Sequence, residues 1–191
     1  MDPRHIPPSR RIINDYEVLA KAVESYRLMG WEIVVTIGTF DMIHIGHSRY
    51  LEAAKQRGHV LIVGVDSDAA VKRYKGPGRP AVPEGERLEM LLHLSYVDLV
   101  TLVDDVDSNG VWAFGLLDAL HPDVYVATED SYDEEQLVEI RKRCKELVVL
   151  PRQAPTSTSE KLRAVALASN KSAAAQLHAI ADKLERGEFD A

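Results

Sequence analysis

The sequence lacks a second cysteine, a long apolar run and an excess of positive charge. Cys144 is the single cysteine among 191 residues, so no internal disulfide can form, which fits a reducing compartment. No stretch approaches the roughly 20 apolar residues of a membrane-spanning helix, and the proline-containing N-terminus lacks the apolar core of a signal peptide. The net charge of −7 argues against a protein that coats nucleic acid. We therefore expect a cytoplasmic protein with neither a membrane nor a nucleic acid as partner.

What the sequence does contain is a regular alternation of short apolar runs and helix-like segments. Hydrophobic residues make up 46% and charged residues 28%, as in soluble globular domains. Apolar runs predict buried strands at 33–37, 60–65, 97–103, 124–127 and 147–150. Helical spacing, composition or end signals predict helices at 15–29, 48–57, 83–94, 111–120, 134–144, 161–167 and 173–184, with a short one after residue 68. This order predicts an α/β fold, a single Rossmann-like three-layer domain with a five-stranded, mainly parallel sheet and C-terminal helices.

The two ends of the chain are interpreted as additions to that domain. Prolines disfavour a helix in residues 1–12, so we expect an extended N-terminal arm. The main domain should cover residues 13–165, and residues 166–191 should form a C-terminal helical extension. An apolar stripe along 173–184 could pack on the domain or on a second subunit, and we expect a homodimer.

A candidate ligand site follows the first predicted strand. Gly38 permits a sharp turn there, and His44 and His47 stand three residues apart at the start of the next helix. Free N–H groups and the positive end of the helix dipole make such a junction a binding site for anions. A metal site at Asp41, His44 and His47 is the alternative. The sequence has no further Cys/His cluster to complete it, so we predict no metal site.

Other strand ends should lie at the same edge of a parallel sheet. The loops expected there are 38–47, 66–80, 127–133 and 151–159. The second loop ends in the one strongly basic stretch, residues 72–80, and the last contains a hydroxyl-rich helix start in which Ser157 and Glu160 have capping-box spacing. Basic side chains and helix starts together indicate a phosphate-rich ligand. A solvated loop is the alternative interpretation of the basic stretch.

Residues 39–41, followed by His-Ile-Gly-His at 44–47, resemble the signature of the cytidylyltransferase-like nucleotidyltransferases, whose hallmark is a His-x-Gly-His motif. The resemblance covers about residues 13–165. The segments that look like the adenylyltransferase domain of ADP-heptose synthase are 54–55, 65–68, 72–80, 86–87 and 96–98. Arg152 and residues 156–159 resemble the closing Arg and Ser-Thr-Thr motif of the family, which includes glycerol-3-phosphate and phosphocholine cytidylyltransferases.

The resemblance implies a site in three parts. Residues with a catalytic role at the phosphates would be His44, His47, Lys55 and Arg87. Residues that contact a nucleoside triphosphate, ATP or CTP, would be Gly38, Thr39, Phe40, Asp41, Gly46, Asp130, Arg152, Thr156, Ser157, Thr158 and Ser159. Residues that contact a phosphorylated small-molecule acceptor would be Asp66, Lys72, Lys75 and Arg79. The acceptor's own phosphate would be the nucleophile, and Mg²⁺ bound mainly by the nucleotide phosphates and water is expected.

One segment departs from the family pattern. Heptose-type enzymes carry Lys-Gly-Gly-Asp after the fourth strand and glycerol-3-phosphate enzymes carry Gly-Asp-Asp, whereas this chain has Ala-Thr-Glu-Asp at 127–130. Because that loop helps to form the nucleoside pocket in the family, the choice of base stays open. We expect transfer of AMP to a heptose-like sugar 1-phosphate.

Three alternatives accompany that expectation. One is a CTP-dependent enzyme that acts on a polyol, choline-like or related phosphate, and another is a non-catalytic nucleotide-binding module. Class I aminoacyl-tRNA synthetases also share the His-x-Gly-His motif. The chain is too short for one of these enzymes and lacks a Lys-Met-Ser-Lys-Ser loop.

Overall fold

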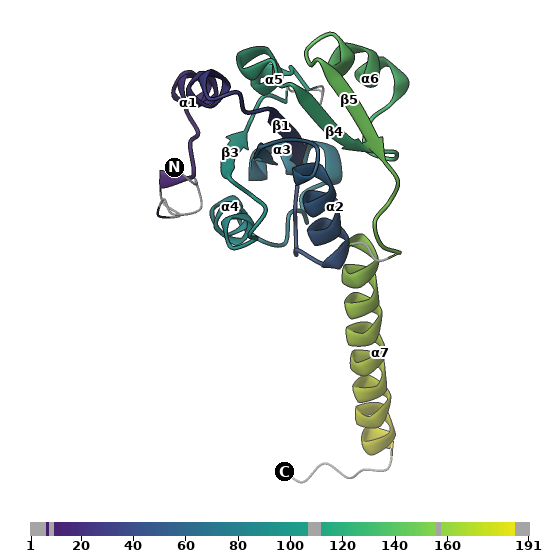
Figure 1. The fold of residues 1–191 in the computed structure, drawn as a ribbon. Helices are drawn as coiled ribbons and strands as arrows, with labels where there is room; N and C mark the ends of the chain where they lie inside the picture. Colours follow the sequence, from purple (N-terminus) through teal and green to yellow (C-terminus); the bar gives the residue numbers. More distant parts are fainter. Residues whose placement is uncertain (1–6, 8–9, 107–111, 156–157, 186–191) are drawn as a thin grey trace. The chain divides into compact units, whose positions relative to one another are not determined.

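The central element of the fold is a five-stranded parallel sheet. A computed structural model describes residues 7, 10–106, 112–155 and 158–185. The strands are β1 (Ile33–Gly38), β2 (Val60–Asp66), β3 (Leu99–Val103), β4 (Val124–Thr128) and β5 (Glu146–Leu150), in the spatial order β3-β2-β1-β4-β5 (Figure 1). All neighbouring pairs are parallel. This confirms the predicted Rossmann-like architecture.

Helices cover both faces of the sheet because alternate residues of each strand point to opposite sides. Val34 packs with α2 (Ile45–Lys55) and α4 (Glu84–Leu92), whereas Ile33 and Val35 pack with the other layer. That layer consists of α1 (Tyr16–Leu28), α5 (Gly115–Leu120) and α6 (Glu134–Arg141) (Figure 1). The apolar strands are therefore buried on both sides, as their sequence predicts.

The strand order reverses between β1 and β4, which is where open α/β sheets bind ligands. Direct pairing there involves only Val34 with Val124 and Val35 with Tyr125, although β1 continues to Gly38. Beyond this short ladder the hydroxyl of Tyr50, on α2, joins the two strands. It donates to the Val126 carbonyl at 2.7 Å and lies 2.6 Å from the Thr36 hydroxyl. The middle of α2 is thus fixed beside the point where the two strands part.

One predicted segment differs from the structure. Lys72 and Lys75, expected in a loop, lie in the last turn of α3 (Asp68–Lys75), where positive side chains are favoured by the helix dipole. Gly76, with φ of +92°, ends that helix. The end of the predicted extended arm, residues 1–12, is attached to the sheet. Arg11 is buried, with its guanidinium donating to the carbonyls of Leu92 and Asp98, and Ile12 pairs with Val100 of β3.

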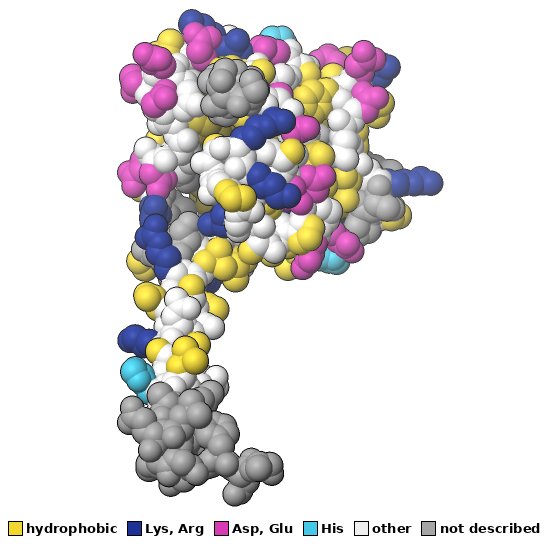
Figure 2. Space-filling view, turned by 180° about the vertical axis from the view of Figure 1, so that it is seen from behind, with side chains coloured by type: hydrophobic (Ala, Val, Ile, Leu, Met, Phe, Trp, Pro, Cys, Tyr) yellow, Lys and Arg dark blue, Asp and Glu magenta, His cyan; other side chains and the backbone are white. Residues whose placement is uncertain are grey.

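The C-terminal helices predicted at 161–167 and 173–184 are one continuous helix, α7 (Thr158–Glu185). Residues 1–155 and 156–191 form two compact units, and α7 lies in the second. Val165, Leu167 and Leu177 are strongly exposed, and hydrophobic side chains are visible along this helix in Figure 2. Within the residues that the structure describes, no helix combines the length and the hydropathy needed to cross a membrane.

Candidate active site

The loop after β1 holds two stacked histidine rings. The centroids of His44 and His47 lie 3.9 Å apart with an interplanar angle of 18°. His44 is the N-cap of α2, and its Nδ1 accepts a hydrogen bond from the Gly46 N–H at 3.1 Å. In the neutral ring this leaves the hydrogen on Nε2, which is then a donor. The pair therefore sits at a helix N-terminus that already favours anions.

Packing fixes this pair from both sides. A Cβ at Gly46 would lie 3.0 Å from ring atoms of His44 and 3.3 Å from the Cβ of Ala154, so the glycine between the histidines leaves room for the His44 ring. The buried ring of Phe40 meets His47 edge to face at 5.6 Å. Phe40 and Met42 both have positive φ, 50° and 48°, a conformation that non-glycine residues rarely adopt. Surrounding contacts must hold this turn.

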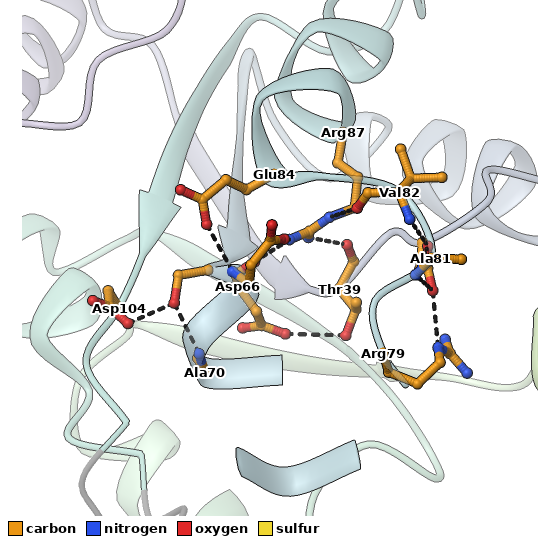
Figure 3. Close-up of polar contacts among 12 residues, drawn as sticks. Thr39, Asp66, Ala70, Arg79, Ala81, Val82, Glu84, Arg87 and Asp104 are labelled. Carbon is orange, nitrogen blue, oxygen red and sulfur yellow. Dashed lines mark hydrogen bonds and ion pairs between the residues drawn. The ribbon is translucent and has the colours of Figure 1, made fainter. Parts of the chain in front are cut away.

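Asp41, between the two positive-φ residues, supplies one of those contacts. Its buried carboxylate accepts hydrogen bonds from the N–H groups of Ala81 and Val82 and from Nε of Arg79 at 2.9 to 3.1 Å (Figure 3). Burial favours the protonated acid, but these bonds outweigh it and hold the pKa of Asp41 below its ordinary value. Asp41 and Arg79, assigned by resemblance to the nucleotide and the acceptor, thus connect the loop after β1 to the segment before α4.

Arg87, on α4, supplies a second set of contacts to the turn after β1 and its neighbours. Its side chain is 1% exposed, and it donates to the carbonyls of Thr39, Asp66 and Val82 at 2.6 to 2.9 Å and to the Asp68 carboxylate at 2.8 Å (Figure 3). The contact with the triphosphate that the resemblance implies for Arg87 stays a prediction, while the bonds observed here give the residue a structural role. Three carbonyls, one at the end of β2 and two in the segments after β1 and before α4, need buried donors, and the Arg87 guanidinium supplies them and positions these segments.

Lys55 is not part of this constellation. It ends α2, and its ammonium pairs with the Asp98 carboxylate and donates to the His59 carbonyl. Both partners precede strands, at the amino edge of the sheet, and Asp98 also accepts from the Leu61 N–H at 2.7 Å. The catalytic role that the resemblance implies for Lys55 stays a prediction, while these contacts point to a structural role. The residue stabilises the opposite edge of the sheet.

A polar cluster gathers at the carboxyl ends of β1 and β2. The Thr39 hydroxyl lies 2.7 Å from the Tyr74 hydroxyl and 3.3 Å from Oδ2 of Asp66, and it accepts from Nζ of Lys75 at 2.8 Å. Burial raises the pKa of Asp66 and lowers the pKa of Lys75. Of the predicted acceptor residues, Asp66 and Lys75 are thus brought together, while Lys72 is exposed on α3. Tyr74 was not among the predicted site residues, because this end of α3 was predicted to be a loop.

The loops after β4 and β5 form a separate polar contact. Arg152 donates to the Asp130 carboxylate at 2.5 Å, and its backbone N–H points to Glu129 at 3.4 Å. The bond from Arg152 lowers the pKa of Asp130. Both predicted nucleotide residues are therefore adjacent. Thr156 and Ser157 lie outside the described residues, as does the side chain of Ser159, and Thr158 begins α7.

The sequence matches a known protein family and several curated relatives. A family described as cytidylyltransferase-like matches residues 35–179. This range includes residues 39–47, which hold His44 and His47 and are called the histidine loop here, and the carboxyl ends of all five strands. The bifunctional protein HldE of a Nitratiruptor species is 34% identical over 158 residues, 82% of this chain and 33% of that protein. HldE of Syntrophotalea carbinolica is 38% identical over 64% of this chain and 24% of that protein. The chain thus spans about a quarter to a third of these curated relatives.

Solved structures show the same fold. The lipopolysaccharide core biosynthesis protein from Thermoplasma volcanium has a TM-score of 0.53 and 28% identity, over 67% of this chain and 100% of that one. Pantoate-beta-alanine ligase from Francisella tularensis has a TM-score of 0.57 at 16% identity, over 78% and 72% of the two chains, a likeness of fold alone. The family match covers well over half of the sequence and confirms the resemblance of the His-x-Gly-His motif. The chain belongs to the cytidylyltransferase-like family.

Proposed function

We propose that the chain is a nucleotidyltransferase that transfers a nucleoside monophosphate from a nucleoside triphosphate to a phosphorylated sugar and releases pyrophosphate. The observation that carries this proposal is the stacked pair of His44 and His47 at the start of α2, beside the point where β1 and β4 separate. Donors at a helix N-terminus suit the charge of a triphosphate. The family match to residues 35–179 supports the same class of reaction.

The proposed reaction needs positioning and charge neutralisation more than a protein nucleophile. An oxygen of the acceptor phosphate attacks the α-phosphorus in line, a new P–O bond forms, and the bond from the α-phosphorus to the bridging oxygen breaks as pyrophosphate leaves. His44 Nε2–H and the His47 ring would face the negative charge that develops on the α-phosphate. The fixed stacking of the two rings means that little reorganisation accompanies the transition state.

The acceptor would approach from the α3 side of the histidine loop. Lys75, bonded to Thr39, offers an ammonium there, and Lys72 is exposed on the same helix. Across the described residues, no group of three or more His, Cys, Asp or Glu side chains could hold a metal ion. The donor set fits an Mg²⁺ that is carried by phosphate oxygens and water, with the role of neutralising the triphosphate.

The finer proposal is transfer of AMP from ATP to a heptose-like sugar 1-phosphate, because the curated relatives named above are HldE proteins. A second candidate is a CTP-dependent transferase that acts on a polyol or choline-like phosphate, and residues 127–130 are the reason for it. This segment does not follow the heptose-type pattern, and Asp130 is already engaged by Arg152.

Pyrophosphate release tests base and acceptor together. The chain would be assayed with ATP, CTP, GTP and UTP, each against hexose and heptose 1-phosphates, glycerol 3-phosphate and phosphocholine. We expect release with ATP and a sugar 1-phosphate. Release only with CTP and a polyol or choline phosphate would favour the second candidate. Nucleotide binding without release in any combination would reject an enzyme and favour a binding module.

We also propose that α7 takes part in a homodimer. Val165 and Leu177 are 65% and 67% exposed on a helix of 28 residues. Long helices in water gain most of their stability from packing an apolar face, which a second copy would provide. Light scattering should give the mass of two chains, and the mass of one chain would contradict this proposal.

A further inference from the structure

Tyr74 places a phenol between two strand ends. Its hydroxyl donates to the Asp66 carboxylate at the end of β2 and lies 2.7 Å from the hydroxyl of Thr39, the first residue after β1. Its ring lies 5.4 Å from the ammonium of Lys75. The side chain is 44% exposed, so the phenol belongs to the accessible surface of the site and not to the core.

The hydrogen bonds of this cluster form a chain. Lys75 donates to the Thr39 oxygen at 2.8 Å. The single hydrogen of Thr39 can go to Tyr74 or to Asp66, and the single hydrogen of Tyr74 goes to Asp66. An ammonium is thereby connected to a carboxylate through two hydroxyls, which orients all four groups. Such chains strengthen each member bond in a partly buried site.

The same chain reaches the histidine loop through Thr39. The Thr39 carbonyl is held by the Arg87 guanidinium at 2.6 Å, and the next residue, Phe40, packs on the His47 ring. The Lys75 ammonium is therefore bonded to Thr39, the residue next to the Phe40 that supports His47. Loss of the Thr39 hydroxyl would remove the bond to the ammonium, and loss of the Tyr74 hydroxyl would remove a partner that orients Thr39. Neither change removes the charge of Lys75.

We propose that Tyr74 is a positioning residue, which orients the Thr39 hydroxyl and thereby holds the Lys75 ammonium beside the histidine loop to receive the anionic group of the acceptor. This proposal rests on the proposed function for the identity of that acceptor. Burial raises the pKa of Asp66 and lowers the pKa of Lys75, so both charged forms depend on their partners. Asp66 is faced by Tyr74 and Lys75 from α3, Thr39 from the β1 loop and Arg87 from α4.

Inorganic phosphate is the probe for this role, because the acceptor is unidentified. Calorimetric titration would measure phosphate binding with and without saturating ATP, for the unaltered protein and for Tyr74→Phe. This change keeps the ring over Lys75 and removes the hydroxyl. We expect about a tenfold weaker affinity for phosphate, as for the loss of one hydrogen bond in a charged cluster, with ATP affinity within about twofold. Lys75→Met should abolish the binding that Tyr74→Phe weakens.

Tyr26→Phe is the matched control, because Tyr26 lies on α1 and stacks on Trp31, which precedes β1, away from the carboxyl ends of the strands. It should leave both affinities unchanged. Circular dichroism would check the fold of each variant. If Tyr74→Phe did not fold, Thr39→Val against Thr39→Ser would test the same chain, with weaker phosphate binding expected only for valine.

Three results would overturn the proposal: equal phosphate affinity with and without the Tyr74 hydroxyl, no saturable phosphate binding by the unaltered protein, or equal losses of ATP and phosphate affinity. The last would show a general structural effect. Phosphate binding that depends on Tyr74, in a protein that does not bind ATP, would reject the proposed function and leave the positioning role standing. The two failures are thus distinguishable.

Discussion

The ring of His44 stacks on the ring of His47 at 3.9 Å, and each ring is fixed by a different neighbour. The Gly46 N–H orients His44, whereas Phe40 supports His47. Contacts within the protein thus hold the pair in place. Preorganised donors of this kind stabilise developing charge without a reorganisation cost in the reaction step.

The first prediction concerns that pair. His47→Ala should lower turnover by about 10² to 10³, the usual effect of losing one transition-state donor, and should leave the fold intact. Steady-state pyrophosphate release and circular dichroism would measure the two effects. Unchanged turnover in a folded His47→Ala protein would remove the central role that we assign to this ring.

Arg87 should matter for stability through its position. Arg87→Met leaves three carbonyls and the Asp68 carboxylate without their buried donor, so we expect a loss of about 3 to 5 kcal/mol in the free energy of unfolding. Urea denaturation would measure it. Arg141→Met is the matched control, because Arg141 is half-exposed and its pair with Glu134, at 3.4 Å, should contribute less than about 1 kcal/mol. Equal losses in the two variants would contradict the assignment.

Lys55 should behave as a structural residue. Lys55→Met leaves the Asp98 carboxylate, which is 3% exposed, without its ammonium, and we expect a loss of about 1 to 3 kcal/mol in the free energy of unfolding. The kcat/KM of the folded variant should stay within about twofold. A large fall in kcat with unchanged stability would restore the catalytic role that the family resemblance implies.

Asp41 gives a prediction for pH. Its folded pKa is depressed, so its contribution to stability is present above the unfolded pKa of about 3.9 and is lost as pH falls through the folded value. Asp41→Asn should therefore lose about 2 kcal/mol at pH 7, and the difference from the unaltered protein should shrink below about pH 4. Denaturation at pH 7, 5 and 3 would check this. A difference that stays constant over this range would show that ionisation of Asp41 does not matter.

The sheet could be predicted because its signal is local. Each strand is a short apolar run, and the alternation with helices leaves few topologies. The histidine loop was found because Gly38, His44 and His47 lie within ten residues. Lys55 lies away from the histidine pair, although the resemblance implies a role for it at the phosphates. Lys55 is the last of the 11 residues of α2, so the helical rise of about 1.5 Å per residue places it about 15 Å from the first residue of that helix.

Other features depend on contacts between segments distant in the sequence. Nothing local to Arg87 shows that its partners are carbonyls of Thr39 and Asp66, 48 and 21 positions away. Tyr74 was hidden because the glycines and prolines of 76–80 made the basic stretch look like a loop from its start. A helix predicted as far as Lys75 would have placed Tyr74 in its last turn, beside Lys75 at the predicted site.

The fate of the α-phosphate of ATP tests the central claim most directly. With ATP labelled separately at the α- and γ-phosphorus and a sugar 1-phosphate that supports turnover, we expect the α-label in the sugar nucleotide and the γ-label in pyrophosphate, in equal amounts. A γ-label in the sugar product, or no transfer of the α-label with any acceptor of the panel, would contradict nucleotidyl transfer at the His44 and His47 pair.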